Sequence, residues 1–91
     1  MDINQIEQLT RADLNLMVVF AAIDKHRHVT KAAKQLKLSQ PAMSHALNRL
    51  REFFEDPLFV KTSHGMVPTP KAAELATPIQ ELLTQFHATI Y

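Results

Sequence analysis

The sequence predicts a mainly α-helical domain with three short helices, a two-stranded hairpin and one long final helix. Three observations lead to this prediction. Between residues 14 and 54, apolar residues recur at the i, i+3, i+4 spacing of helices with one buried face. Two short runs rich in β-branched and aromatic residues flank a turn that contains the only glycine of the chain. A last apolar stripe of helical spacing runs from residue 70 to the end.

The composition is that of a small globular domain. A chain of 91 residues with an apolar fraction of 46% can form one compact core. It has no cysteine, which excludes a disulfide framework and a thiolate metal site. Its start, MDINQIEQLT, is too polar and acidic for a signal peptide, and no apolar run approaches the ~18–20 residues of a membrane span. We therefore expect a cytoplasmic domain that makes no contact with a membrane.

Basic residues are concentrated in one part of the chain, although the net charge is only +1. Residues 25–51 hold seven lysines and arginines and no acid, whereas residues 1–24 hold four acids and one arginine. Such a block is typical of a surface that binds a polyanion. The alternative is a basic face that is only solvated, but such a face usually carries acidic partners at i±4. The block contains none.

The first of the three helices is predicted to begin after Asp13, which suits an N-cap, and to end near His26. Its buried stripe has the spacing of one helix face and consists of Leu16, Val19, Phe20 and Ile23. Thr30 is expected to cap the second helix, KAAKQLKL. Its paired alanines are small enough to let another helix approach closely.

A tight break separates the second helix from the third. Ser39 is the expected N-cap, and Pro41 lies in the first turn, where its missing N–H costs nothing. The helix PAMSHALNRLREFF should bury Met43, Ala46, Leu47, Leu50 and at least one of Phe53 and Phe54. Its other side then carries Ser44, His45, Asn48, Arg49 and Arg51. Two short helices joined by so tight a turn form a helix-turn-helix.

The hairpin follows directly. LFVKT at 58–62 is predicted to be a strand, SHG a turn, and MVPT at 66–69 a shorter return strand. Pro68 confines the return strand to an edge of the sheet. A ribbon in this place is a wing, so residues 14–69 are predicted to form a winged helix-turn-helix after an N-terminal extension at 1–13. Lys61 and His64 lie beside the tip of the wing, where they can reach a bound polyanion.

Residues 70–91 are predicted to form one long helix, capped by Thr69 and begun by Pro70. At ~1.5 Å per residue it is about 30 Å long, more than so small a domain can cover. We therefore expect a dimer interface, rather than core, formed by Leu75, Ile79, Leu82, Leu83 and Phe86. Pro78 predicts a kink in this helix. Because the apolar pattern still continues at Tyr91, we expect the chain to be the first part of a longer protein.

These motifs together resemble a known family. The order VTKAAKQLKLSQPAMSHALNRLRE, DPLFVKTSHGMVPTPKA and a long helix resembles the N-terminal DNA-binding domain of bacterial LysR-type transcriptional regulators. The resemblance implies that the third helix, at about 41–54, reads the major groove of double-stranded DNA at an interrupted inverted repeat. It also implies a homodimer through antiparallel linker helices, or a tetramer at full length, associated with the nucleoid. A separate C-terminal domain that binds a small effector has no counterpart here, and no cofactor is expected in this domain.

The resemblance assigns roles to individual residues. Its base-reading positions fall on Gln40, Pro41, Ser44 and His45. Its backbone contacts fall on Thr30, Lys31, Ser39, Asn48 and Lys61, to which the placement of Arg49 and His64 adds two more. Many members have arginine, the common reader of guanine, where this chain has His45, so the base preference should differ there.

Several alternatives remain from the residues alone. Arg49 and Arg51 can instead form ion pairs with Glu52, Glu55 or Asp56. The five histidines lack the usual spacing of metal ligands, so no metal is expected. An enzyme would need a nucleophile–base pair, paired carboxylates or a glycine-rich phosphate loop, and none is evident. A winged-helix module that binds protein is the remaining alternative, and it would show little duplex affinity, without the steep salt dependence of a DNA reader.

Overall fold

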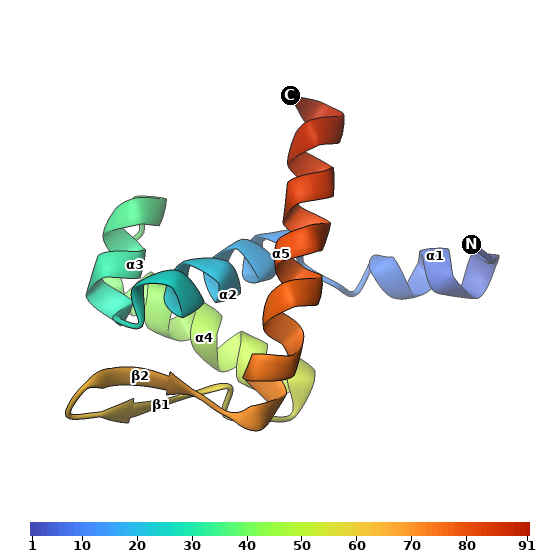
Figure 1. Ribbon diagram of the computed structural model, residues 1–91. Coiled ribbons are helices and arrows are strands. Elements are labelled where there is room, and N and C mark those ends of the chain that lie inside the picture. The colour runs from blue at the N-terminus through green and yellow to red at the C-terminus, as the bar shows by residue number, and fades with distance from the viewer.

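The structure, a computed structural model, describes all 91 residues. Its elements are α1 (Ile3–Leu9), α2 (Leu14–His26), α3 (Val29–Leu36), α4 (Gln40–Phe54), β1 (Phe59–Thr62), β2 (Gly65–Pro68) and α5 (Pro70–Ile90). α2, α3 and α4 form the body, with the β1–β2 ribbon below it, while α5 rises past α2 and α1 projects to the opposite side from α3 (Figure 1). The predicted mainly α-helical fold with a wing is confirmed. No helix is long and apolar enough to cross a membrane.

The core is built around α2, as the sequence predicts. The Asp13 carboxylate accepts a hydrogen bond from the Asn15 N–H at 2.9 Å and caps the helix. The buried residues of α2 are Leu16, Met17, Val19, Phe20, Ala22 and Ile23. Ala32 and Ala33 are buried as well, because α3 approaches closely there. The Phe20 ring packs on the ring of Phe59, with centroids 5.2 Å apart, and so joins the wing to the helical core.

The predicted start of the second helix is wrong. α3 is capped by His28, whose backbone is extended and whose Nδ1 accepts from the Lys31 N–H at 3.4 Å. Thr30 therefore lies inside the first turn of α3 and caps nothing. The physical reason is that a neutral imidazole nitrogen carries a lone pair, which can accept a backbone N–H as a hydroxyl oxygen does.

The third helix agrees with its prediction at its start and along its buried face. Ser39 Oγ accepts from the Ala42 N–H at 3.2 Å, and the proline lies in the first turn. Buried residues are Met43, Leu47 and Leu50, whereas Ala46 and Phe54 are partly buried. Phe53 remains 49% exposed and makes an edge-to-face contact with Phe54.

The N-terminal extension contains a helix that the sequence analysis did not predict. α1 begins with a capping box: Asp2 Oδ1 accepts from the Gln5 N–H at 2.8 Å, and Gln5 Oε1 accepts from the Asp2 N–H at 2.8 Å. The signal was present, because an N-cap residue followed three positions later by glutamine marks a helix start. None of its residues is buried.

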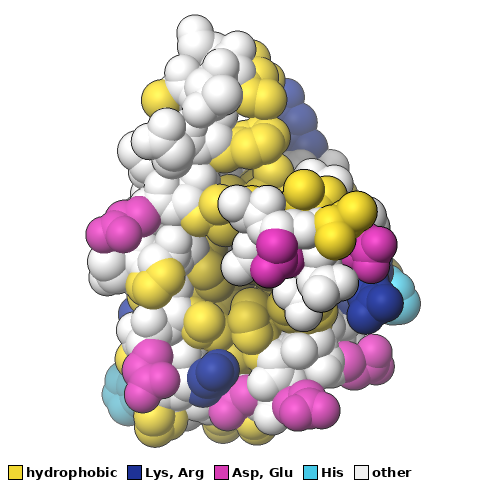
Figure 2. Space-filling view, turned by 90° about the vertical axis from the view of Figure 1, so that its right-hand side faces the viewer, with side chains coloured by type: hydrophobic (Ala, Val, Ile, Leu, Met, Phe, Trp, Pro, Cys, Tyr) yellow, Lys and Arg dark blue, Asp and Glu magenta, His cyan; other side chains and the backbone are white.

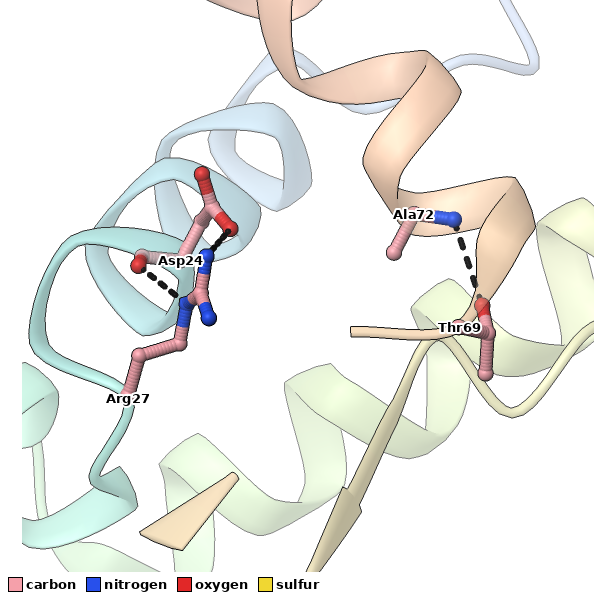
Figure 3. A network of polar contacts seen from close by, with 4 residues as sticks. All are labelled: Asp24, Arg27, Thr69 and Ala72. Atoms are coloured by element: carbon pink, nitrogen blue, oxygen red, sulfur yellow. Dashed lines mark hydrogen bonds and ion pairs between the residues drawn. The ribbon is translucent and has the colours of Figure 1, made fainter. Parts of the chain in front are cut away.

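The wing is held against the helices at both ends. β1 and β2 are antiparallel, with Thr62 opposite Gly65 at the turn and Phe59 opposite Pro68 at the base. Near the turn, the Met66 N–H donates to the Arg27 carbonyl at 2.8 Å. Arg27 closes α2 in a left-handed conformation, and its guanidinium binds the carboxylate and carbonyl of Asp24 (Figure 3).

A second set of hydrogen bonds joins the base of the wing to α5. Asp56 Oδ2 accepts from Thr69 Oγ1 at 2.7 Å and from the Leu58 N–H at 2.8 Å. Thr69 Oγ1 also accepts from the Ala72 N–H at 3.2 Å and caps α5 (Figure 3). The hydrogen bond from Thr69, followed by that from Leu58, lowers the pKa of the Asp56 carboxyl below its ordinary value of 3.8. The predicted cap at Thr69 is thus confirmed.

The last helix corrects the predicted interface. Ile79 is only 5% exposed, and Leu75 and Leu83 pack against the same core. The assignment of Ile79 to a dimer interface is therefore wrong, because α2 lies against this side of α5 and buries it within the chain. Leu82 and Phe86 remain 47% and 45% exposed. α5 continues as a helix through Pro78, and a kink there stays a prediction.

Replacing Gly65 with alanine should destabilise the domain. Gly65 has a φ of +100°, and an added Cβ would lie 2.6 Å from the Arg27 carbonyl oxygen, which accepts the Met66 N–H. The left-handed backbone and the clash together should cost ~1–3 kcal/mol of unfolding free energy. Urea denaturation followed by circular dichroism measures it, with Ser63→Ala in the same exposed turn as the control. Equal midpoints for Gly65→Ala and wild type would show that the wing does not dock on Arg27.

Acid should weaken the link between the wing and α5. Because the folded pKa of Asp56 is lowered, its contribution to stability is complete above the unfolded value of 3.8 and is lost as pH falls through the folded pKa. Asp56→Asn should therefore be less stable than wild type at pH 6, and the difference should shrink below pH 3.8. Urea midpoints from pH 6 to pH 3 test this. A difference that stays constant across that range would contradict it.

Candidate nucleic-acid interface

A polar groove lies between the outer face of α4, the start of α3 and the wing. Its volume is about 330 Å³. Among its lining residues are five that the sequence analysis assigned to DNA contacts: Thr30, Gln40, Ser44, Asn48 and Lys61. These side chains come from three separate elements. Folding therefore brings together residues up to 31 positions apart in the chain, from Thr30 to Lys61.

One row of side chains on α4 forms the floor of this groove. Gln40, Ser44 and Asn48 follow one another at i, i+4 and i+8, which places them on one side of the helix. All three are exposed. Met43 and Leu50 are buried on the opposite side of the helix. The row of polar side chains therefore faces away from the core. Amide and hydroxyl groups here can both donate hydrogen bonds to a ligand and accept them.

Six of the assigned residues are not brought into the groove. Pro41 and His45 are exposed on a neighbouring side of α4, and Lys31 is exposed on α3. The Ser39 hydroxyl already serves as the N-cap of α4. His64 lies at the tip of the wing, with its Nδ1 3.1 Å from Ser63 Oγ. The sixth is Arg49.

Arg49 faces another part of the molecule. Its Nη1 lies 3.7 Å from Asp13 Oδ2, in an ion pair that is about half exposed. The alternative partners Glu52, Glu55 and Asp56 are therefore wrong for this residue. Such a pair contributes little to stability because solvent screens it. It does, however, tie the guanidinium to the start of α2.

Arg51 was not assigned a site by the sequence, and its contacts are structural. Its Nε donates to the Pro57 carbonyl at 2.8 Å, and its Nη2 donates to the Phe59 carbonyl at 2.8 Å. Its Nη1 donates to Asn48 Oδ1 at 3.2 Å. Arg51 is therefore not a free side chain available to DNA, and it forms no ion pair with Glu52, Glu55 or Asp56. No local pattern predicts these bonds, because they depend on where β1 lies relative to α4.

The groove also contains His28, which the sequence analysis missed. The ring caps α3 through Nδ1, so its other nitrogen carries the proton when the ring is neutral. The sequence analysis would have identified His28 if it had considered histidine as a possible N-cap residue. The backbone of the wing completes the lining at Gly65 and Met66.

The charges around the groove favour an anionic ligand. The chain has two ion pairs, Asp24 with Arg27 and Asp13 with Arg49. No carboxylate forms an ion pair with Lys31, Lys34, Lys37 or Lys61. The starts of α3 and α4 lie at the same surface and add the partial positive charge of helix N-termini. No group of three or more histidines and acids gathers anywhere in the chain.

Known proteins are similar to this chain in sequence and in fold. Residues 14–73 match the family described as bacterial regulatory helix-turn-helix protein, lysR family. The chain is 53% identical over 72 residues to the transcriptional activator NahR of Pseudomonas putida, covering 79% of this chain and 24% of NahR. The crystal structure of the probable transcriptional regulator PA0477 from Pseudomonas aeruginosa is similar with a TM-score of 0.86 and 41% identity, covering 90% of this chain and 28% of that one.

A more distant structure shows the same fold. It is a crystal structure of the BenM DNA-binding domain in complex with catB site 1 DNA, with a TM-score of 0.81 at 24% identity over 87% of this chain and 89% of that one. The chain spans about a quarter of the length of NahR, and the family match covers more than half of the chain. The chain therefore belongs to the LysR family of bacterial helix-turn-helix regulators.

Proposed function

We propose that this chain is the DNA-binding and dimerisation part of a transcription regulator, with α4 as the helix that enters the major groove of double-stranded DNA. The observation that carries the proposal is the row of Gln40, Ser44 and Asn48, exposed along one side of α4 and flanked by the start of α3 and the wing. A helix with hydrogen-bonding side chains on its open side can reach base edges in the major groove, which is wide enough to admit it.

For the individual residues we propose the roles that the family resemblance implies. Gln40, Ser44 and His45 read bases, with Pro41 against the base edges. Lys31, Thr30, Asn48 and Lys61 contact the phosphate backbone, together with the backbone N–H groups at the start of α4 and His64 at the tip of the wing. Arg49 contributes only long-range charge while it pairs with Asp13.

We further propose that two copies of the chain pair through the exposed second half of α5 and bind an inverted repeat. The apolar side chains there include Leu82, Phe86 and Ile90, each about half exposed. Hydrophobic side chains form a band up the middle of the face shown in Figure 2, from the body toward the end of α5. Beside them a groove of about 430 Å³ opens between α2 and α5, lined in part by Val18 and Leu83. Most of its lining residues are hydrophobic, which suits apolar side chains from the helix of a second copy.

The remaining parts of the proposal concern the whole protein. The relatives are regulators more than three times as long as this chain, which supports a larger protein with a separate effector-binding domain. A role on chromosomal DNA implies the cytoplasm, and it requires no catalytic group and no cofactor in this domain.

Sites selected from random duplexes should separate the two kinds of DNA contact. Lys31→Ala should weaken binding to all duplexes by a similar factor and lower the log–log salt slope by about 1, as loss of a phosphate contact does.

His45→Ala should instead cost ~1–3 kcal/mol on the selected site and little on random DNA. Fluorescence anisotropy measures both, over a series of salt concentrations for Lys31→Ala and at one fixed salt concentration for His45→Ala. If wild type and His45→Ala select the same site, His45 does not read bases; a chain without duplex affinity would be a protein-binding module instead.

Leu82→Glu should convert the dimer into a monomer. The substitution places a charge where two copies would meet, and a charge that is desolvated without a partner costs several kcal/mol. Sedimentation equilibrium gives the mass, and circular dichroism shows that the helices remain. Thr84→Glu, at an exposed position on the opposite side of the same helix, is the matched control. A dimer of unchanged affinity in Leu82→Glu would place the interface elsewhere.

A further inference from the structure

The side chain of Asn48 is held in one orientation by Arg51. The contact joins Arg51 Nη1 to Asn48 Oδ1 at 3.2 Å. A guanidinium has five donors and no acceptor, so the atom of the amide that faces it must be the oxygen. The amide nitrogen, with two N–H donors, is therefore on the other side of the same planar group. It donates to no protein acceptor, and Asn48 is exposed at the groove.

Arg51 is itself held firmly. Two further donors of its guanidinium bind the carbonyls of Pro57 and Phe59, both at 2.8 Å. Phe59 is fully buried, and its ring packs on Phe20. Rotation of the guanidinium would break both of these hydrogen bonds to backbone carbonyls near the base of the wing. The orientation of Asn48 is thus fixed through Arg51 by the packed core.

We propose that Arg51 is a positioning residue that fixes the amide of Asn48 with its N–H donors toward DNA. This inference rests on the proposed function. Asparagine that turns freely can read adenine with its oxygen and nitrogen together, accepting from N6–H₂ and donating to N7. Arg51 binds one of the two lone pairs of the Asn48 oxygen and holds that atom toward the guanidinium, so the amide presents its two free N–H donors to the groove. The amide then donates to a phosphate oxygen, or to a base acceptor such as N7 or O6 of guanine.

Asn48→Asp should affect thermal stability and affinity for DNA in different ways. Asn48→Asp places a carboxylate opposite the guanidinium, and such a charge-assisted hydrogen bond is stronger than the neutral one it replaces. Thermal stability should therefore be unchanged or higher. Affinity for DNA should fall about 10-fold or more, because the donors are lost and a negative charge faces the phosphates.

A double-mutant cycle tests the route from Arg51 to DNA. The variants are Arg51→Met, which keeps the apolar stem, Asn48→Ala and the pair, each measured on the selected duplex by fluorescence anisotropy. Arg51→Met should weaken binding about 10-fold in the presence of Asn48 and by less than about 3-fold in Asn48→Ala. The same cycle with Lys61→Ala in place of Asn48→Ala is the control for movement of the wing, and the effects there should multiply.

Three results would be decisive. If wild type binds duplex DNA but the losses from Arg51→Met and Asn48→Ala multiply, Arg51 does not act through Asn48 and the inference fails. If wild type binds no duplex, the proposed function itself fails. Should Arg51→Met unfold, Arg51→Lys replaces it in the cycle, and its loss of affinity should again be smaller in Asn48→Ala than in the presence of Asn48. Losses from Arg51→Lys and Asn48→Ala that multiply in folded variants would likewise overturn the inference.

Discussion

The direction of the recognition helix depends on the burial of α2. This helix buries six side chains, and α3, α4 and α5 all pack against it. Each fully buried large apolar side chain stabilises the fold by about 1.5–3 kcal/mol. α3 comes close because Ala32 and Ala33 leave it room, and α4 is held by Met43, Leu47 and Leu50. The polar row on α4 is thus oriented by apolar packing on the opposite side of the helix.

The wing imposes a second constraint, because a two-stranded ribbon is marginally stable alone. Here it is held by the Arg27 carbonyl near its turn, by the Phe59 ring in the core and by the hydrogen bonds of Arg51 and Asp56 at its base. The groove has one wall on this ribbon. Its shape therefore follows from contacts among parts of the chain up to 39 residues apart, from Arg27 to Met66.

What the sequence could predict was local. The caps at Asp13, Ser39 and Thr69 depend on a side chain and an N–H two or three positions away, so residue type and order suffice. The contacts of Arg51 were missed because they cross from a helix to a strand. The burial of Ile79 was missed for a related reason: an apolar stripe has the same spacing whether it meets its own core or a partner. Only the position of α5 against α2 decides between them.

The division of α5 connects dimerisation to DNA reading. Its first half, around Ile79, is packed on α2, while the second half of the same apolar stripe, at Leu82 and Phe86, stays open. Its first turn is joined to the wing through Thr69 and Asp56. In the proposed dimer, a partner on the second half of α5 would thus be attached to the same rigid body that carries α4. The spacing of two recognition helices must match half-sites about one helical turn apart, ~34 Å. A rigid α5, and not a flexible tether, meets that requirement.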